Sequence, residues 1–271
     1  MADHDHTNAW ARVASAAILV PLVLGIVYAG APAFHIVLAL VTLLLAREWD
    51  AMCGGVGNRS AAVPALAAIA IVAVAAYGDY PMALLAILAG AALSYGAARW
   101  NDHIHPLWSA AGVLYIGIPA VAMVWLRGEP EFGRATLFWL LGVVWAMDTG
   151  GFLVGRAVGG PRLAPVISPN KTWAGLFGGL FCASMGALVA GTWIELRGFW
   201  LFIAISAALA LVTQAGDLVE SKIKRHFGVK DSGSLIPGHG GMFDRLDGLL
   251  AAAPALALLY LATGAGKKIW L

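Results

Sequence analysis

Charged residues are concentrated in one stretch of this otherwise apolar chain, between Ser221 and Asp247. Two carboxylate pairs lie in or just before it, Asp217 with Glu220 and Asp244 with Asp247. Residues three positions apart share a helix face, so the members of each pair can act together. Carboxylate oxygens suit Mg²⁺, which proteins commonly hold through one or two carboxylates together with substrate phosphates. The spacing therefore predicts a site for a metal ion and a polyphosphate.

Basic residues and glycines accompany these acids. Lysine and arginine can neutralise phosphate oxygens, and arginine can do so through two parallel hydrogen bonds. Glycines allow backbone N–H groups to approach an anion closely. An ordinary basic loop with surface ion pairs is the alternative interpretation, but it does not account for the acids. The candidate phosphate-binding residues are Lys222, Lys224, Arg225, His239, Gly240, Gly241 and Arg245, with Lys230 and Asp231 in the same stretch.

Two polar groups precede this stretch. Ser168 and Pro169 suit the N-cap and first turn of a helix, so we expect a helix to begin there. Its free N–H groups, together with Lys171, would then attract an anion. Asp148 lies near the end of an apolar segment, where an ionisable group is costly and indicates function, with simple interfacial placement as the alternative.

Composition indicates what holds these residues. Of 271 residues, 61% are hydrophobic and 12% charged, against about half and about a quarter in soluble domains. A membrane span needs about 20 mainly apolar residues, and the chain offers about nine such segments. We therefore predict an all-α integral membrane protein, one polytopic domain over 1–271 with N-terminal spans in 1–134 and a catalytic half in 135–271. The segments are 12–29, 33–49, 61–78, 81–98, 107–126, 135–155, 173–194, 199–219 and 248–265.

Charge distribution predicts the orientation. With a cytoplasmic N-terminus, most of the 17 Lys and Arg residues fall in cytoplasmic segments, as the positive-inside rule requires. The segments 156–172 and 220–247 then lie on the same, cytoplasmic side, where nucleotides are available. A net charge of +2 argues against a nucleic-acid partner.

The C-terminal half resembles the phosphatidate cytidylyltransferases. Their signature is matched in order and spacing by Ser221–Arg225, Lys230–Gly233 and Pro237–Asp247, and the resemblance extends to Asp148 and to 168–172. Two positions depart from the family pattern, because Asn170 replaces a lysine and Ala174 replaces a glutamate. Within 168–172, the resemblance therefore assigns family roles to Ser168, Lys171 and Thr172.

The resemblance implies a reaction in which CTP and phosphatidic acid give CDP-diacylglycerol and pyrophosphate. It implies Mg²⁺ held by Asp217 and Asp244, with a second metal or a monovalent cation as an open alternative. It also implies a homodimer among membrane lipids, in the bacterial cytoplasmic (inner) membrane with its active site facing the cytoplasm. The expected catalytic residues are Asp217, Asp244, Lys224, Arg225, Asp247 and Asp148. The expected substrate-binding residues are Ser168, Lys171, Thr172, Ser221, Lys222, Lys230, Asp231, His239, Gly240, Gly241 and Arg245.

Two other functions fit parts of the pattern. The first is cytidylyl transfer to another lipid phosphate, which depends on pocket shape. The second is an ion-coupled transporter that uses Asp148 and Asp217 as ion ligands. Transporters usually show repeat symmetry, and the chain has none that we detect.

Overall fold

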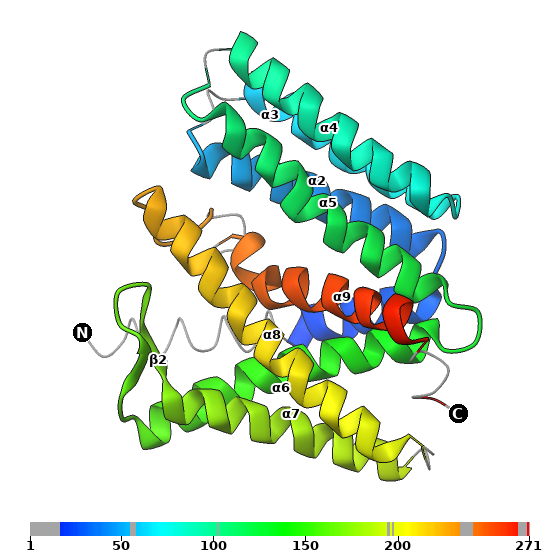
Figure 1. Cartoon of the computed structure of the whole chain (residues 1–271), viewed down its shortest axis with the longest axis vertical. Helices are drawn as coiled ribbons and strands as arrows, with labels where there is room; N and C mark the ends of the chain where they lie inside the picture. Colours follow the sequence, from blue (N-terminus) through cyan, green and yellow to red (C-terminus); the bar gives the residue numbers. More distant parts are fainter. Residues whose placement is uncertain are drawn as a thin grey trace. The chain divides into compact units, whose positions relative to one another are not determined.

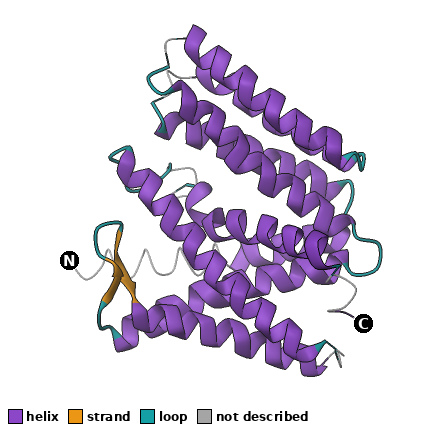
Figure 2. Cartoon of the chain, in the orientation of Figure 1, coloured by secondary structure: helices purple, strands orange, loops and turns teal. Residues whose placement is uncertain are grey.

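The computed structural model describes residues 17–54, 58–101, 103–193, 196, 198–233, 241–264 and 270. These residues are almost entirely helical, with one small pair of strands (Figures 1 and 2). An apolar helix over Ala17–Ala29 comes first. The helices that follow are α2 (Ala33–Met52), α3 (Asn58–Ala76), α4 (Tyr80–Trp100), α5 (Pro106–Gly128), α6 (Gly133–Val158), α7 (Trp173–Trp193), α8 (Phe199–His226) and α9 (Phe243–Thr263).

Six of the helices in the described residues, α4 to α9, are long and apolar enough to cross a bilayer. Each lies on a segment predicted to span, and the chain is an integral membrane protein. The helix Ala17–Ala29 is short as described, and α2 carries Arg47, Glu48 and Asp50 near its end. Nine spans and a cytoplasmic N-terminus therefore stay predictions.

The chain forms two compact units, which we describe separately. The first comprises Met1–Val124 and Asp231–Arg245. Within it, α2 packs beside α3 and α3 beside α4 (Figure 1). Helix α5 joins them closely at Gly117, where an added Cβ would lie 3.1 Å from the Ile87 side chain of α4 and 3.2 Å from that of Ile71 in α3.

The second unit comprises Trp125–Lys230 and Leu246–Leu271. Helices α6 and α7 lie side by side here (Figure 1). A Cβ on Gly150 would lie 2.7 Å from Cys182, and one on Gly179 would lie 2.6 Å from the carbonyl oxygen of Met147. Small residues allow membrane helices to approach this closely, so that dispersion forces hold them together without a hydrophobic driving force. The loop between α6 and α7 therefore connects two closely packed helices.

That loop corrects one prediction. Ser168 does not cap a helix: Ser168–Thr172 is strand β2, which pairs antiparallel with β1 (Arg162–Ala164), orange in Figure 2. Helix α7 begins only at Trp173, and the Thr172 hydroxyl accepts a hydrogen bond from the Gly175 N–H at 3.0 Å. Thr172 is therefore the N-cap. The local pattern misled because Pro169, an apparent first helical residue, is equally acceptable in the exposed, extended backbone of a two-stranded hairpin.

The polar stretch also differs from the expected long loop. Helix α8 continues to His226 and α9 begins at Phe243, so most of its charged residues lie on helical turns. Basic residues in a last turn and an acid in a first turn are favoured by the helix dipole. Helix α8 ends where Gly228 adopts a φ of 71°. The Val229 N–H bonds to the Lys224 carbonyl oxygen and the Gly228 N–H to that of Arg225, a glycine C-cap of the Schellman type.

Candidate functional site

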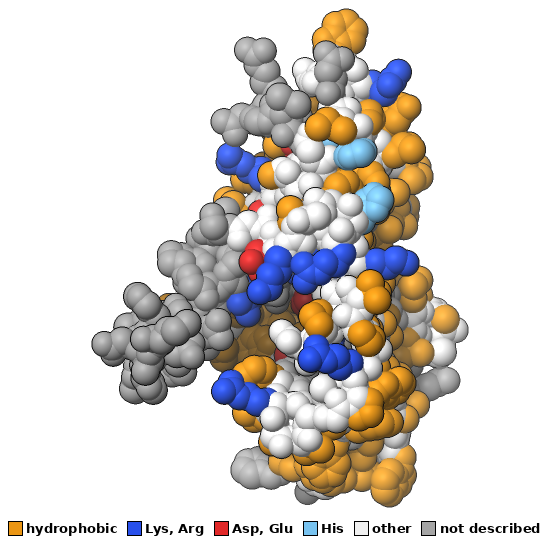
Figure 3. Space-filling view, turned by 90° about the vertical axis from the view of Figure 1, so that its left-hand side faces the viewer, with side chains coloured by type: hydrophobic (Ala, Val, Ile, Leu, Met, Phe, Trp, Pro, Cys, Tyr) orange, Lys and Arg blue, Asp and Glu red, His pale blue; other side chains and the backbone are white. Residues whose placement is uncertain are grey.

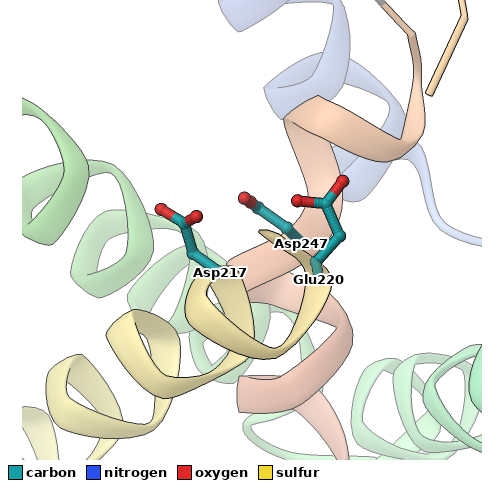
Figure 4. A group of neighbouring side chains, drawn as sticks. All are labelled: Asp217, Glu220 and Asp247. Carbon is teal, nitrogen blue, oxygen red and sulfur yellow. The ribbon is translucent and has the colours of Figure 1, made fainter. Parts of the chain in front are cut away.

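Three carboxylates converge in the second unit. Asp217 and Glu220 extend from α8, and Asp247 extends from α9 (Figure 4). One oxygen from each lies within 4.8 Å of the others. The sequence spacing predicted the Asp217–Glu220 pair, but not that Asp247 completes a group of three.

Two glycines explain why α8 and α9 meet at this point. A Cβ on Gly216 would lie 2.5 Å from the Cβ of Ala251 and 3.0 Å from the carbonyl oxygen of Asp247. On the opposite helix, a Cβ on Gly248 would lie 2.5 Å from Thr213. Each glycine adjoins a carboxylate of the cluster. The absence of side chains at these positions therefore lets the two helix backbones approach until Asp217 and Asp247 are neighbours.

Lysines surround this carboxylate cluster. Lys171, on β2, forms an ion pair with Asp217. Lys224 forms one with Glu220 at 2.9 Å, one helical turn along α8, and Glu220 is 1% exposed. The Ser221 hydroxyl donates to Asp217 at 3.3 Å. Two of the three formal negative charges are thereby offset, so that one remains for a further cation.

The hairpin is fixed to the end of α8. Arg225 donates from Nε to the Ile167 carbonyl oxygen at 3.3 Å and from Nη1 to that of Val229 at 3.2 Å. The structure thus gives this predicted catalytic residue a contact with the loop of the hairpin. Because β2 also carries Lys171, Arg225 helps to place that lysine at the carboxylate cluster.

Other predicted residues lie at the surface of this unit. Asp148, on α6, is exposed and close enough to Asp247 for their charges to interact. Lys222 and Lys230 are exposed, as are Arg156 and Arg162, whereas Ser168 is half-buried. Figure 3 views the chain from the side on which the hairpin lies in Figure 1, and Lys and Arg side chains are exposed on that face. The exposed basic side chains of the second unit suit an anionic substrate.

Asp244 belongs to the first unit. Its carboxylate accepts hydrogen bonds from the Gly241 N–H at 2.9 Å and from the Ser232 N–H at 3.1 Å. It therefore ties together the two sides of the segment that leads into α9. Asp231 and Arg245, in the same unit, are exposed. His239 and Gly240 lie outside the described residues.

Apolar side chains are exposed on helices α7 and α8 of the second unit. Val219 of α8 is 48% exposed, and Trp173 of α7, directly after the hairpin, is 46% exposed. The fold and this site define a polytopic membrane protein with carboxylates and lysines suited to a metal ion and phosphate, on helices that can contact lipid.

Comparison with known proteins agrees with this class. The model of the cytidylyltransferase family matches residues 10–263. A protein of Brucella suis biovar 1 (strain 1330), named phosphatidate cytidylyltransferase, is 37% identical over 265 residues, 94% of this chain and 93% of that protein. Proteins of the same name from Staphylococcus saprophyticus and Staphylococcus aureus (strain COL) are 42% identical over 184 residues and 41% identical over 174. Those matches cover 67% and 64% of this chain, and 70% and 65% of the two proteins.

The chain belongs to the cytidylyltransferase family. Membership favours group transfer over the transporter alternative. Sequence reasoning predicted Asp247 as a catalytic residue but missed its place as the third member of the carboxylate cluster. The i,i+3 pairing of Asp244 with Asp247 was visible in the sequence, but it could not show that Asp247 turns toward α8.

Proposed function

We propose that this protein is a phosphatidate cytidylyltransferase, which transfers the cytidylyl group of CTP to the phosphate of phosphatidic acid. The products are CDP-diacylglycerol, a precursor for phospholipid synthesis, and pyrophosphate. The observation that carries the proposal is the carboxylate cluster of Asp217, Glu220 and Asp247 with its two lysines, in a chain of the cytidylyltransferase family. A phosphate transfer site needs this combination of negative and positive groups.

The carboxylate cluster fits a divalent cation. Its donors are oxygens, which Mg²⁺ prefers, and its formal charge exceeds that of the paired lysines by one. Asp217, Glu220 and Asp247 would hold the ion. The family resemblance adds Asp244 as a ligand, a separate proposal that rests on the signature alone. When bound, the ion supplies positive charge that stabilises phosphate oxygens.

The reaction joins two anions, so its main difficulty is electrostatic. A lipid phosphate oxygen forms a bond to the α-phosphorus of CTP while the bond between that phosphorus and the bridging oxygen of pyrophosphate breaks. The nucleophile is already ionised, so a strong general base is unnecessary. The protein's contribution is positioning and neutralisation. Lys171 and Lys224, held at the cluster by ion pairs, provide the positive charge within the second unit.

A lipid substrate accounts for the apolar side chains that are exposed on α7. Trp173 and Phe177 expose 46% and 61% of their surfaces on α7, which follows the hairpin that carries Lys171. Acyl chains in the bilayer can contact these side chains while the lipid phosphate reaches the lysine. We place the enzyme in the bacterial cytoplasmic membrane with this site on the cytoplasmic side, as a homodimer. Cysteine accessibility in oriented vesicles tests on which side of the membrane the site lies. Mass measurement of the detergent-solubilised protein tests whether it is a homodimer.

The activity assay uses the purified protein, CTP labelled with radioactive phosphorus at the α position, Mg²⁺ and phosphatidate vesicles. Label should enter the lipid extract and unlabelled pyrophosphate should be released in equal amount. Vesicles that contain an isoprenoid ether lipid phosphate serve as the comparison substrate. Labelling of that lipid in preference to phosphatidate, or no labelling of either, would contradict the proposal.

A further inference from the structure

Glu48 lies far from the signature in sequence and is almost fully buried. Its side chain extends from α2 and the residue is 5% exposed. The family signature begins at Ser221, and the resemblance to the family assigns no role to Glu48. A buried carboxylate without compensation is costly, so its partners indicate what it does.

Among the described residues, the side-chain hydrogen-bond partners of Glu48 belong to the signature segment. Oε1 accepts a hydrogen bond from the Met242 N–H at 2.8 Å, and Oε2 accepts one from the Phe243 N–H at 2.8 Å. These donors lie at the start of α9, where N–H groups lack partners within the helix. Glu48 therefore caps α9 from a different helix. Hydrogen bonds to an ionised acceptor are about twice as strong as those between neutral groups.

Ser232 extends the connection to the other side of the segment. Its hydroxyl lies 3.2 Å from Glu48 Oε2 and 3.1 Å from Asp244 Oδ2. Asp244 also accepts from the N–H groups of Ser232 and Gly241. Two carboxylates thus hold Ser232 on one side and Gly241 to Phe243 on the other. The residues held in this way include Gly241, which is predicted to bind substrate, and they adjoin Asp244, which is predicted to be catalytic.

Packing around Glu48 leaves little room for movement. A Cβ added to Gly241 would lie 2.7 Å from Glu48 Oε2, so only glycine fits there. The next residue on α2, Trp49, packs its ring 5.6 Å from that of Phe243 and 5.4 Å from that of Tyr115. Phe243 is fully buried. The same turn of α2 therefore holds the start of α9 through both hydrogen bonds and aromatic contacts.

We propose that Glu48 is a positioning residue for cytidylyl transfer, which holds Ser232 and the start of α9 so that Gly241 and Arg245 are placed for binding of the CTP phosphates. This inference rests on the proposed function. Glu48 does not touch the reacting atoms. It acts by fixing Ser232, Met242 and Phe243, so that Gly241 and the first turn of α9 are already in place and less entropy is lost when the nucleotide binds.

Glu48→Gln tests the proposal with little change in shape. The amide can accept from only one of the Met242 and Phe243 N–H groups and presents its own N–H groups to the other. We expect the KM for CTP to rise about tenfold, the size of one charge-assisted hydrogen bond, with a smaller fall in kcat. Ser232→Ala, which removes the link from the other side, should raise KM in the same direction by a smaller factor.

Asp50→Asn is the matched control. Asp50 is also a buried carboxylate of α2, two residues further on, but it pairs with His103 at 3.3 Å. Its loss should lower thermal stability and leave the KM for CTP unchanged. Equal effects of Glu48→Gln and Asp50→Asn on the KM for CTP and on kcat would mean that Glu48 contributes only to stability, and would overturn the proposal. A wild-type KM in Glu48→Gln would also overturn it.

Hydrogen exchange separates this inference from the proposed function. In the absence of nucleotide, the amides of Met242 and Phe243 should exchange at least about tenfold faster in Glu48→Gln than in the wild type, and no faster in Asp50→Asn. Unchanged exchange would refute the positioning role even if the enzyme is active. Faster exchange in Glu48→Gln, together with a wild-type protein that transfers no label, would instead refute the proposed function.

Discussion

Replacement of Gly216 by alanine tests whether the crossing of α8 and α9 builds the site. The new Cβ would lie 2.5 Å from the Ala251 Cβ and 3.0 Å from the Asp247 carbonyl oxygen. Carbon atoms prefer about 3.5–4.0 Å, so the helices must separate by about 1 Å. Neither neighbour is the end of a flexible side chain, and the movement passes to Asp217 and Asp247. A displacement of about 1 Å can lower a rate by about 100-fold.

The assay for Gly216→Ala measures label transfer from CTP to phosphatidate over a range of Mg²⁺ concentrations. We expect kcat to fall about 100-fold and half-maximal activity to require more Mg²⁺. Gly142→Ala on α6 is the matched control, because its Cβ would meet nothing within 4 Å. It should retain full activity. A Gly216→Ala enzyme with the kcat and Mg²⁺ dependence of the wild type would refute the argument that this glycine sets the carboxylate geometry.

Three further predictions follow from the carboxylate cluster and the buried cysteine. Glu220→Gln should raise the Mg²⁺ concentration for half-maximal activity about tenfold or more, because replacing a residue that supports a metal site lowers metal affinity by at least about that factor. An unchanged Mg²⁺ titration would exclude Glu220 as a ligand. Lys171→Ala should lower kcat/KM by about 10–100-fold, the size of a charge-assisted contact, and a wild-type value would leave Lys171 with a structural role only. Burial, and secondarily the charge of Asp50, raises the pKa of the Cys53 thiol to about 12. Below pH 9 the folded Cys182→Ser protein should therefore resist maleimide until it is unfolded. Its free energy of unfolding should fall as pH rises from about 9 toward 12, because the Cys53 thiol ionises at a lower pH in the unfolded chain than in the folded protein.

Much of the fold could be predicted because membrane spans are a property of local composition. Every described helix longer than a few turns lies on a predicted apolar segment, and Gly78 with Asp79 makes a tight turn between α3 and α4. Helix ends were harder to predict. Helix α8 extends to His226, past the last apolar residues, because Glu, Lys and Arg are good helix formers and bases suit a last turn.

The site was predictable to the extent that its contacts are local. Asp217 and Glu220 are three residues apart, so their common face was evident. The pairing of Lys171 with Asp217 and the approach of Asp247 depend on helix packing, which spacing does not encode. The contacts of Glu48 were the hardest to predict, because 194 positions separate it from Met242. In the sequence, a charged residue at the end of an apolar segment is typical of the membrane interface.

The central claim is that cytidylyl transfer takes place at the carboxylate cluster, and one comparison tests it most directly. Wild-type protein and Asp217→Asn are purified in parallel and supplied with phosphatidate, Mg²⁺ and CTP labelled at its α-phosphorus. We expect Mg²⁺-dependent label in the lipid for the wild type and none above background for Asp217→Asn, which should still elute as a folded protein. Full labelling by Asp217→Asn would contradict the central claim.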